Sequence, residues 1–256
     1  FIATLCVTED FPLRIVYFSV FQHAIDNGFV LSSRYSVSKG CDMCYFNVTE
    51  GKHKVNSSPN DVILTVAYKK ITNLIPFVRS LRTTGSKARV VVLCSSNIMK
   101  TKRKDYLDYM EKCGAQFIDI GQFDIRLRSN FMYFRNFLFE QFLSVNINQI
   151  ERVMLLDLYD TIFQRDPFTE AFSSESIYFS NEGYRINTNT RLKGIIHYNL
   201  IFFSYLNPRA ARNKYLMQEV FDRNVLNDGT IAGGAYQVLK FLNYMDRIGC
   251  RSNIKA

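Results

Sequence analysis

Residues 152–168 read Arg-Val-Met-Leu-Leu-Asp-Leu-Tyr-Asp-Thr-Ile-Phe-Gln-Arg-Asp-Pro-Phe, and this stretch decides the fold class. Its apolar part runs directly into Asp157 and Asp160, and Pro167 marks a turn soon afterwards. In open α/β sheets, ligands bind just outside the carboxyl ends of strands. Two carboxylates there are the hard-oxygen site that Mg²⁺ or Mn²⁺ takes while it holds phosphates. The alternative interpretation is a strand-ending turn, because Asp is a common turn residue.

Strands and helices alternate on both sides of this stretch, which predicts an α/β sheet. Besides the strand that precedes Asp157, apolar runs predict strands at residues 62–67, 88–94, 115–120 and 176–180. Apolar residues at helical spacing predict helices over residues 71–81, 105–112, 131–143 and 232–245. Gly114 follows one of these helices at the position where a glycine commonly ends a helix.

Residues 1–58 lack this alternation. They contain Cys41, Cys44 and a polar stretch that ends near Pro59. Clusters of Pro, Ser and Asn indicate loops. We therefore interpret residues 1–58 as an N-terminal extension or stem, and residues 59–256 as the domain, which we expect to fold without it.

The composition narrows the class of protein. A chain of 256 residues that is 47% hydrophobic and 21% charged can bury a substantial core and is not a disordered chain. Its net charge of +9 suits an anionic partner, such as a nucleotide-sugar, a phosphorylated acceptor, a membrane surface or a nucleic acid. No nucleic-acid motif accompanies the basic run 100–104. No apolar run reaches the ~18–20 residues that a membrane helix needs.

The cysteines and glycosylation signals bear on location. Cys41 and Cys44 have the spacing of a zinc or redox pair, but the sequence has no second such pair. Metal binding, a redox pair, disulfides and free thiols all remain open. Asn47 and Asn56 begin glycosylation sequons. They favour the lumen of the secretory pathway, Golgi or ER, over the cytoplasm.

Two blocks carry a family resemblance. Residues 153–168 resemble the donor-site signature of the nucleotide-diphospho-sugar transferases, the GT-A glycosyltransferases, in the branch that reads Asp-x-Arg-Asp followed by Phe-Gln-x-Asp-Pro-Phe. Tyr159 replaces the Arg of that motif. Residues 227–234 resemble the family's glycine-rich acceptor-side loop before a helix. The resemblance spans about Asp61 to Asp246 and implies a GT-A fold, a Rossmann-like and mostly parallel sheet flanked by helices.

The resemblance also implies an activity: metal-dependent transfer of a sugar from a nucleotide-diphosphate donor, a UDP-sugar, to a hydroxyl of a glycan, protein or lipid. Asp160 corresponds to the residue that binds Mn²⁺ or Mg²⁺ directly, and Asp157 to the one that holds the ribose or a metal-bound water. A divalent cation would neutralise the diphosphate as it leaves. We expect Asp166, by contrast, to cap the next turn, and Asp166→Asn neither to abolish the Mn²⁺-dependent part of UDP binding nor to leave the fold intact.

Other residues have donor-side roles by the same resemblance. Thr65, Ala67 and Tyr68 occupy the positions that contact the base and ribose, and Arg135 the position that faces the diphosphate. An Arg in an aromatic helix is costly to bury without an anion. Arg135 could equally pair with a local carboxylate such as Glu140.

On the acceptor side, Asn227, Asp228 and Gly229 are expected in a loop whose glycines let a ligand approach the backbone. Asp228 or Glu182 could act as the general base on an acceptor hydroxyl. A retaining enzyme would use one of them as nucleophile or stabiliser instead. Either carboxylate could also be a solvated loop residue.

Members of the family usually continue to an Asp-Gln block and to a His on the metal, whereas this sequence ends at Ala256. We therefore expect either a fragment or an incomplete catalytic apparatus. The alternative function is a catalytically impaired GT-A domain that binds a nucleotide-sugar or glycan. A basic nucleic-acid-binding protein is a third hypothesis, which rests on net charge alone.

Overall fold

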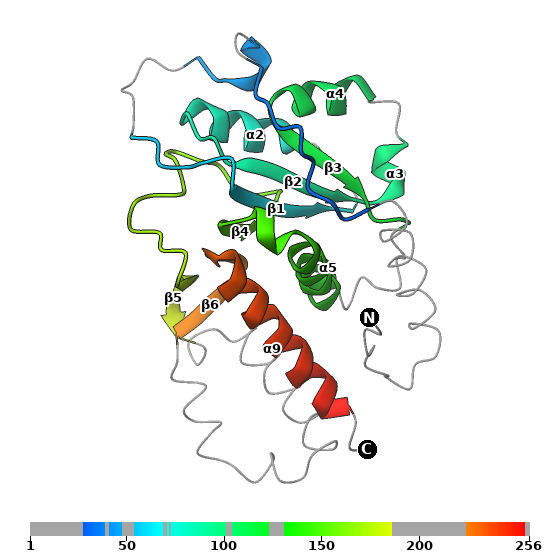
Figure 1. The fold of residues 1–256 in the computed structure, drawn as a ribbon, viewed down its shortest axis with the longest axis vertical. Helices are drawn as coiled ribbons and strands as arrows, with labels where there is room; N and C mark the ends of the chain where they lie inside the picture. Colours follow the sequence, from blue (N-terminus) through cyan, green and yellow to red (C-terminus); the bar gives the residue numbers. More distant parts are fainter. Residues whose placement is uncertain are drawn as a thin grey trace.

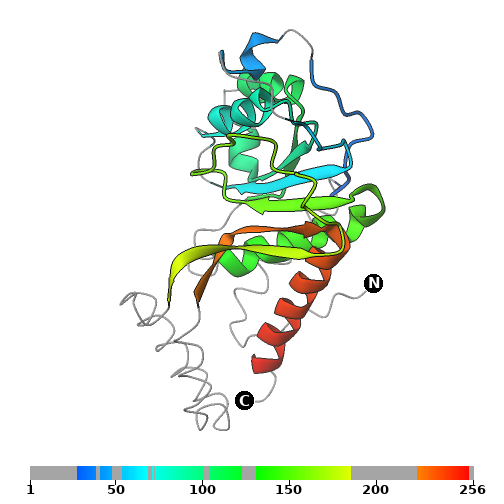
Figure 2. The ribbon, with the colours of Figure 1, turned by 90° about the vertical axis from the view of Figure 1, so that its left-hand side faces the viewer.

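The computed structural model describes residues 28–38, 41–47, 54–68, 71, 73–100, 104–122, 131–185 and 224–253. These residues form three layers, with a sheet between two sets of helices (Figures 1 and 2). None of the helices among them is both long and apolar enough to cross a membrane.

The sheet has six strands in the order β3-β2-β1-β4-β6-β5. Its strands are β1 Asp61–Ala67, β2 Arg89–Cys94, β3 Ala115–Asp119, β4 Arg152–Leu156, β5 Ile177–Arg185 and β6 Asn224–Gly234. β1, β2, β3 and β4 are mutually parallel, whereas β6 runs antiparallel to both of its neighbours, β4 and β5. The predicted α/β class, with a mostly parallel core, is confirmed.

Helices cover both faces of this sheet. On one face lie α2 Leu74–Thr83, α3 Ser96–Met99 and α4 Lys104–Lys112; on the other lie α5 Phe131–Asn146 and α9 Ala235–Asn253. Two short 3-10 turns complete the described elements, η1 Asp42–Cys44 and η3 Ile147–Gln149. Side chains alternate across a strand, so Val62 and Leu64 of β1 pack on the α5 side while Ile63 packs on the α2 side. Every residue of β1 is buried, as expected for a strand covered on both faces.

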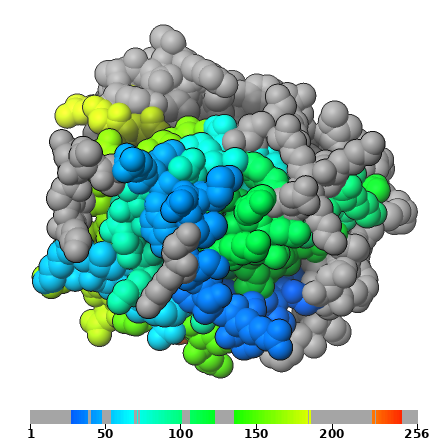
Figure 3. Space-filling view, turned by 90° about the horizontal axis from the view of Figure 1, so that it is seen from above, coloured from blue at the N-terminus to red at the C-terminus, as the bar shows by residue number. Residues whose placement is uncertain are grey.

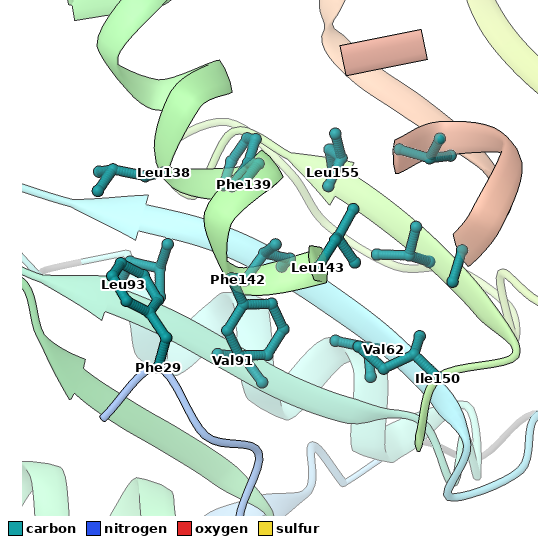
Figure 4. Packing of buried hydrophobic residues seen from close by; sticks show 14 of the residues in the cluster. Phe29, Val62, Val91, Leu93, Leu138, Phe139, Phe142, Leu143, Ile150 and Leu155 are labelled. Atoms are coloured by element: carbon teal, nitrogen blue, oxygen red, sulfur yellow. The ribbon is translucent and has the colours of Figure 1, made fainter. Parts of the chain in front are cut away.

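The α5 face holds one continuous hydrophobic core. Phe139, Phe142 and Leu143 of α5 pack over Val91 of β2 and Leu155 of β4 (Figure 4). These residues are 2% exposed or less. Burial of aromatic and aliphatic side chains on this scale is the main stabilising term for the layer, roughly 1.5–3 kcal/mol for each fully buried side chain.

Each predicted strand and helix is found, with two boundary corrections that matter. Residues 227–234 do not form a loop, because they belong to β6. Two glycines there serve chain packing: a Cβ at Gly233 would lie 2.4 Å from Ser176 O, and one at Gly234 only 1.6 Å from Ser174 O. The helix consequently begins at Ala235 rather than at residue 232. Similarly, β5 continues to Arg185, so Glu182 lies within a strand and not after one.

The described part of the N-terminal extension packs against the domain. Phe29 and Leu31 are 4% and 1% exposed and belong to the α5-side core. Leu31 N donates to Asn146 Oδ1 at 2.7 Å. A disulfide joins Cys44 of η1 to Cys113, just after α4. Residues 28–38 and 41–47 are therefore attached to the core at several points, although the boundary at residue 58 stays a prediction.

One buried carboxylate joins the amino-terminal ends of β1 and β4, and a second holds the segment before β1 to the turn at residue 166. Asp61 is fully buried and forms two hydrogen bonds of 2.7 Å with the guanidinium of Arg152. Asp166 Oδ2 accepts the backbone N–H groups of Asn56 and Ser57, each at 2.8 Å, and its Oδ1 accepts Phe168 N at 3.4 Å. Asp166 thus caps its turn, as the sequence predicts. It is also only 2% exposed, so Asp166→Asn should destabilise the protein.

Candidate functional site

The candidate site lies where the chain changes direction along the sheet. From β1 the chain passes to β2 and then to β3, and it returns through α5 to β4 on the other side of β1. The connection after β1 runs on the α2 face, whereas the connection before β4 runs on the α5 face (Figure 2). Ligands of open α/β sheets bind at such a switch point, outside the carboxyl ends of the two strands. Tyr68 follows β1 and Asp157 follows β4 at this end.

Asp157 forms an ion pair with Arg135. Arg135 Nη1 of α5 donates to Asp157 Oδ1, and the Arg135 side chain is 4% exposed while that of Asp157 is 44% exposed. Of the two partners considered for Arg135, a diphosphate or a local carboxylate, the structure supplies a carboxylate, that of Asp157. One partner is buried and the other reaches solvent, so a ligand can approach the pair from the Asp157 side.

The backbone around Asp157 fixes the position of its carboxylate. Asp157 N donates to Gly229 O of β6 at 3.1 Å, and Thr161 Oγ1 donates to Asp157 O at 2.7 Å. A Cβ at Gly229 would lie 2.4 Å from Asp157 Oδ2 and 2.9 Å from Asn227 Oδ1. A side chain at Gly229 would therefore displace the Asp157 carboxylate, which packs directly on the backbone of this glycine.

The predicted acceptor-side residues join the same cluster. Asn227 Nδ2 of β6 donates to Glu182 Oε1 of β5 at 2.6 Å. Glu182 is exposed. Asn227 Oδ1 also lies against Gly229. Five of the predicted residues therefore form one continuous row along α5, the end of β4, β6 and β5. In order, they are Arg135, Asp157, Gly229, Asn227 and Glu182. Asp228 belongs to β6 by its backbone, but its side chain lies outside what the structure describes.

Asp160 lies three residues beyond Asp157, in the exposed turn after β4. The preceding residue is tethered, because Asn73 Nδ2 at the start of α2 donates to Tyr159 O. Within the described part of the chain, the group of three metal-ligating side chains that lie close together is elsewhere, at Cys41, Cys44 and Cys113. A cation held by Asp160 and Asp157 would therefore need further oxygens from a ligand, as expected for Mg²⁺ or Mn²⁺ bound with phosphates.

The three residues predicted at the end of β1 differ in access. Thr65 and Ala67 are fully buried, whereas Tyr68 is half-buried. Ser95 N donates to Ala67 O at 3.0 Å, and Ser95 Oγ to Tyr68 O at 3.2 Å. Thr65 Oγ1 has no hydrogen-bond partner among the described residues, and an unpaired buried hydroxyl costs about 1–3 kcal/mol. Tyr68 is thus the one member of this set with a side chain that a ligand can reach.

Reasoning from sequence missed three supporting residues. Asn73 and Thr161 hold the turn that carries Asp157 and Asp160, and Ser95 holds the end of β1. A signal existed for Thr161, which lies inside the motif, and for Asn73, which directly precedes the apolar stripe of α2. Ser95 carried no such signal, because its role depends on β2 lying beside β1.

Comparisons with models of known protein families, with curated proteins and with solved structures found no match to this chain. The interpretation of the site therefore depends on its own residues and their geometry.

Proposed function

We propose that this protein is a metal-dependent glycosyltransferase of GT-A type that binds a nucleotide-diphospho-sugar, a UDP-sugar, at the carboxyl ends of β1 and β4. The observation that carries the proposal is the Arg135–Asp157 pair at the switch point of the sheet. It sets a buried cation and a half-exposed carboxylate side by side where ligands of such sheets bind. A diphosphate with its bound divalent cation carries the complementary charges: the phosphate oxygens suit the Arg135 guanidinium, and the metal ion suits the Asp157 carboxylate.

The charges favour such a ligand over a neutral one. A guanidinium that is 4% exposed is stabilised only if it is paired. An incoming diphosphate can take the place of Asp157 at Arg135 through charge-assisted hydrogen bonds. The Asp157 carboxylate, no longer engaged by Arg135, then faces the cation together with the exposed Asp160.

The residues have distinct roles in the proposed transfer. A divalent cation, when bound, would act as a Lewis acid on the leaving diphosphate. Arg135 binds and orients the diphosphate, and Tyr68 is placed to contact the nucleotide. Glu182 takes the proton of the acceptor hydroxyl at its carboxylate, and Asn227 orients Glu182 through their hydrogen bond of 2.6 Å. Asp228 is the alternative base.

Calorimetric titration of UDP with and without Mn²⁺ tests this function. Metal and nucleotide should each tighten the binding of the other, because they share the site. Asp160→Asn should abolish the Mn²⁺-dependent part of UDP affinity and leave the unfolding midpoint unchanged, since Asp160 is exposed. Glu175→Gln removes an equally exposed carboxylate from the loop before β5 and is the matched control.

Two results would sink the proposal: UDP affinity that is indifferent to Mn²⁺, or Asp160→Asn binding UDP and Mn²⁺ as the wild type does. Metal-independent binding of UDP or of a glycan, without transfer, would instead favour the catalytically impaired binding domain.

A further inference from the structure

Three cysteine sulfurs meet on the α2 face of the sheet, away from the site described above. Cys44 and Cys113 form a disulfide across 69 residues of sequence. The sulfur of Cys41, which is a free thiol, lies within 4.8 Å of both of them. The backbone brings this about, because η1 turns the chain between Cys41 and Cys44, and Cys44 N donates to Cys41 O at 2.9 Å.

The three sulfurs differ in access to solvent. Cys44 and Cys113 are fully buried, whereas Cys41 is half-buried. The segment that carries Cys41 runs over the outer side of α2 and α4, and Figure 3 shows it as the blue band across that face. An external reagent can therefore reach Cys41 before it can reach the disulfide itself.

We propose that Cys41, Cys44 and Cys113 form a thiol–disulfide exchange site in which Cys41 is the attacking thiol. The Cys41 thiolate attacks Cys44 Sγ, so that a Cys41–Cys44 bond forms, the Cys44–Cys113 bond breaks and Cys113 leaves as a thiolate. The proton that Cys41 loses is taken up by Cys113. Attack on Cys113 Sγ gives the other isomer, Cys41–Cys113, and frees Cys44. Neither step needs an external oxidant or reductant.

Exchange fits these residues better than a structural metal site. A closed zinc site requires four ligands, and the group found among the described residues supplies three sulfurs, two of which are already bonded to each other. Exchange requires only a thiol next to a disulfide, which is the observed arrangement. Exchange would also loosen the fold locally, since the Cys41–Cys44 isomer releases the tether between η1 and the end of α4.

Cys94 supplies an internal contrast. It is a free thiol that is fully buried in β2. Burial, with the nearby Asp119 carboxylate, raises the pKa of the Cys94 thiol, which makes the thiolate scarce. Cys94 should therefore neither exchange nor react in the folded protein.

The exchange site makes a kinetic prediction for reduction by a dithiol. After exchange, the disulfide contains the half-buried Cys41 sulfur, and dithiothreitol can attack it there. Cys41→Ser removes this route and leaves a disulfide whose two sulfurs are both buried. Reduction of Cys44–Cys113 in the folded protein should then be at least about tenfold slower than in the wild type, because a well-placed intramolecular nucleophile has a large effective concentration.

The experiment follows reduction under native conditions, with alkylation of free thiols by N-ethylmaleimide and mapping of each labelled cysteine by mass spectrometry. In the wild type without reductant, label should appear on Cys41 and, in a smaller fraction, on Cys44 or Cys113. Cys94→Ser is the matched control and should be reduced at the wild-type rate. Urea unfolding of each variant checks that the fold is intact, and Cys41→Ala replaces Cys41→Ser if that variant does not fold.

Three outcomes would overturn the proposal. One is equal reduction rates in the wild type and the Cys41 variants. Another is label in the wild type that stays on Cys41 and never reaches Cys44 or Cys113. The third is a Cys41 that is already in a disulfide with Cys6 or Cys250. The side chains of these two cysteines lie outside what the structure describes, so the peptides that contain them are mapped as well.

Discussion

Replacement of Arg135 separates a ligand-binding role from a structural one. In Arg135→Ala the guanidinium that we place on the diphosphate is lost. A charge-assisted hydrogen bond contributes roughly 1.5–3 kcal/mol, so the Kd for UDP with Mn²⁺ should rise by about 10- to 150-fold. The same variant should bind free Mn²⁺ as the wild type does or slightly better, because Asp157 no longer pairs with Arg135.

The effect of Arg135→Ala on folding follows from the exposure of the two partners. A buried pair that loses one partner usually costs about 3–5 kcal/mol, because the other charge stays buried. Here the remaining partner, Asp157, has a side chain that is 44% exposed and can hydrate. We therefore expect the free energy of unfolding to fall by about 1–2 kcal/mol, mainly because the packing of the Arg135 side chain is lost. The guanidinium of Arg135 lies 5.9 Å from the centre of the Phe139 ring.

The assay pairs calorimetry of UDP with urea denaturation. Arg135→Lys keeps the charge but not the planar fork, and it should lose part of the affinity. Arg79→Ala removes a positive charge from α2, where the half-buried Arg79 side chain donates to Tyr45 O, and it controls for the change in net charge. Unchanged UDP affinity in Arg135→Ala, together with a loss of stability above about 3 kcal/mol, would refute the reasoning and make Arg135 a structural partner of Asp157.

Three further predictions address residues around the site and the core. Gly229→Ala should weaken UDP binding at least about tenfold with little change in the unfolding midpoint, because its Cβ would displace the flexible Asp157 carboxylate, 2.4 Å away; calorimetry that finds wild-type affinity would contradict it. Arg82→Met should lower the free energy of unfolding, measured by urea denaturation, by about 3–5 kcal/mol. The reason is that Arg82 is 1% exposed and donates to the carbonyls of Ser86, Ala88, Cys113 and Gly114. A loss below about 1 kcal/mol would show that those carbonyls find other donors. Burial, and then the Asp108 charge, raises the pKa of Glu111. Folding is therefore most favourable below the unfolded pKa of Glu111, where its carboxyl is protonated, and this advantage is lost as pH rises through the folded pKa. In thermal melts, Glu111→Gln should be more stable than wild type at pH 7, by less than about 1 kcal/mol because the residue is largely exposed, and the difference should vanish near pH 4.

The parallel part of the sheet was predictable because its strands are buried on both faces. Residues 62–67 and 89–94 are apolar throughout apart from Thr65 and Arg89, and a short apolar run between turn residues has few other interpretations. β6 was not predictable, because Asn227, Asp228 and Gly229 have low strand propensity. Its strand conformation depends on tertiary packing, which places Ser174 and Ser176 against Gly233 and Gly234.

The candidate site was predictable as a set of residues but not as a set of contacts. Asp157 and Arg135 were both identified, yet their pairing across 22 residues requires α5 to lie beside the end of β4. The disulfide was harder still to predict from the sequence. The local spacing pairs Cys44 with Cys41, whereas its actual partner, Cys113, is 69 residues away. Spacing along the chain indicates local ligand pairs, whereas bonds between distant elements depend on the packed structure.

One geometric feature links the site to the fold. The pairing of β4 with β6 ends in two successive interactions: the register pair Leu156–Thr230, and then the hydrogen bond from Asp157 N to Gly229 O. The pairing of β4 with β6 at this point therefore also sets the position of the Asp157 carboxylate. A shift of β6 by one residue would put a side chain where Gly229 lies and would turn every β6 side chain to the other face. It would also disturb the Asp157–Arg135 pair, because a Cβ beside Asp157 would displace its carboxylate. The register of β6 and the charge arrangement at the switch point thus support each other, which explains how a strand with such low intrinsic propensity can be fixed in one register beside the site.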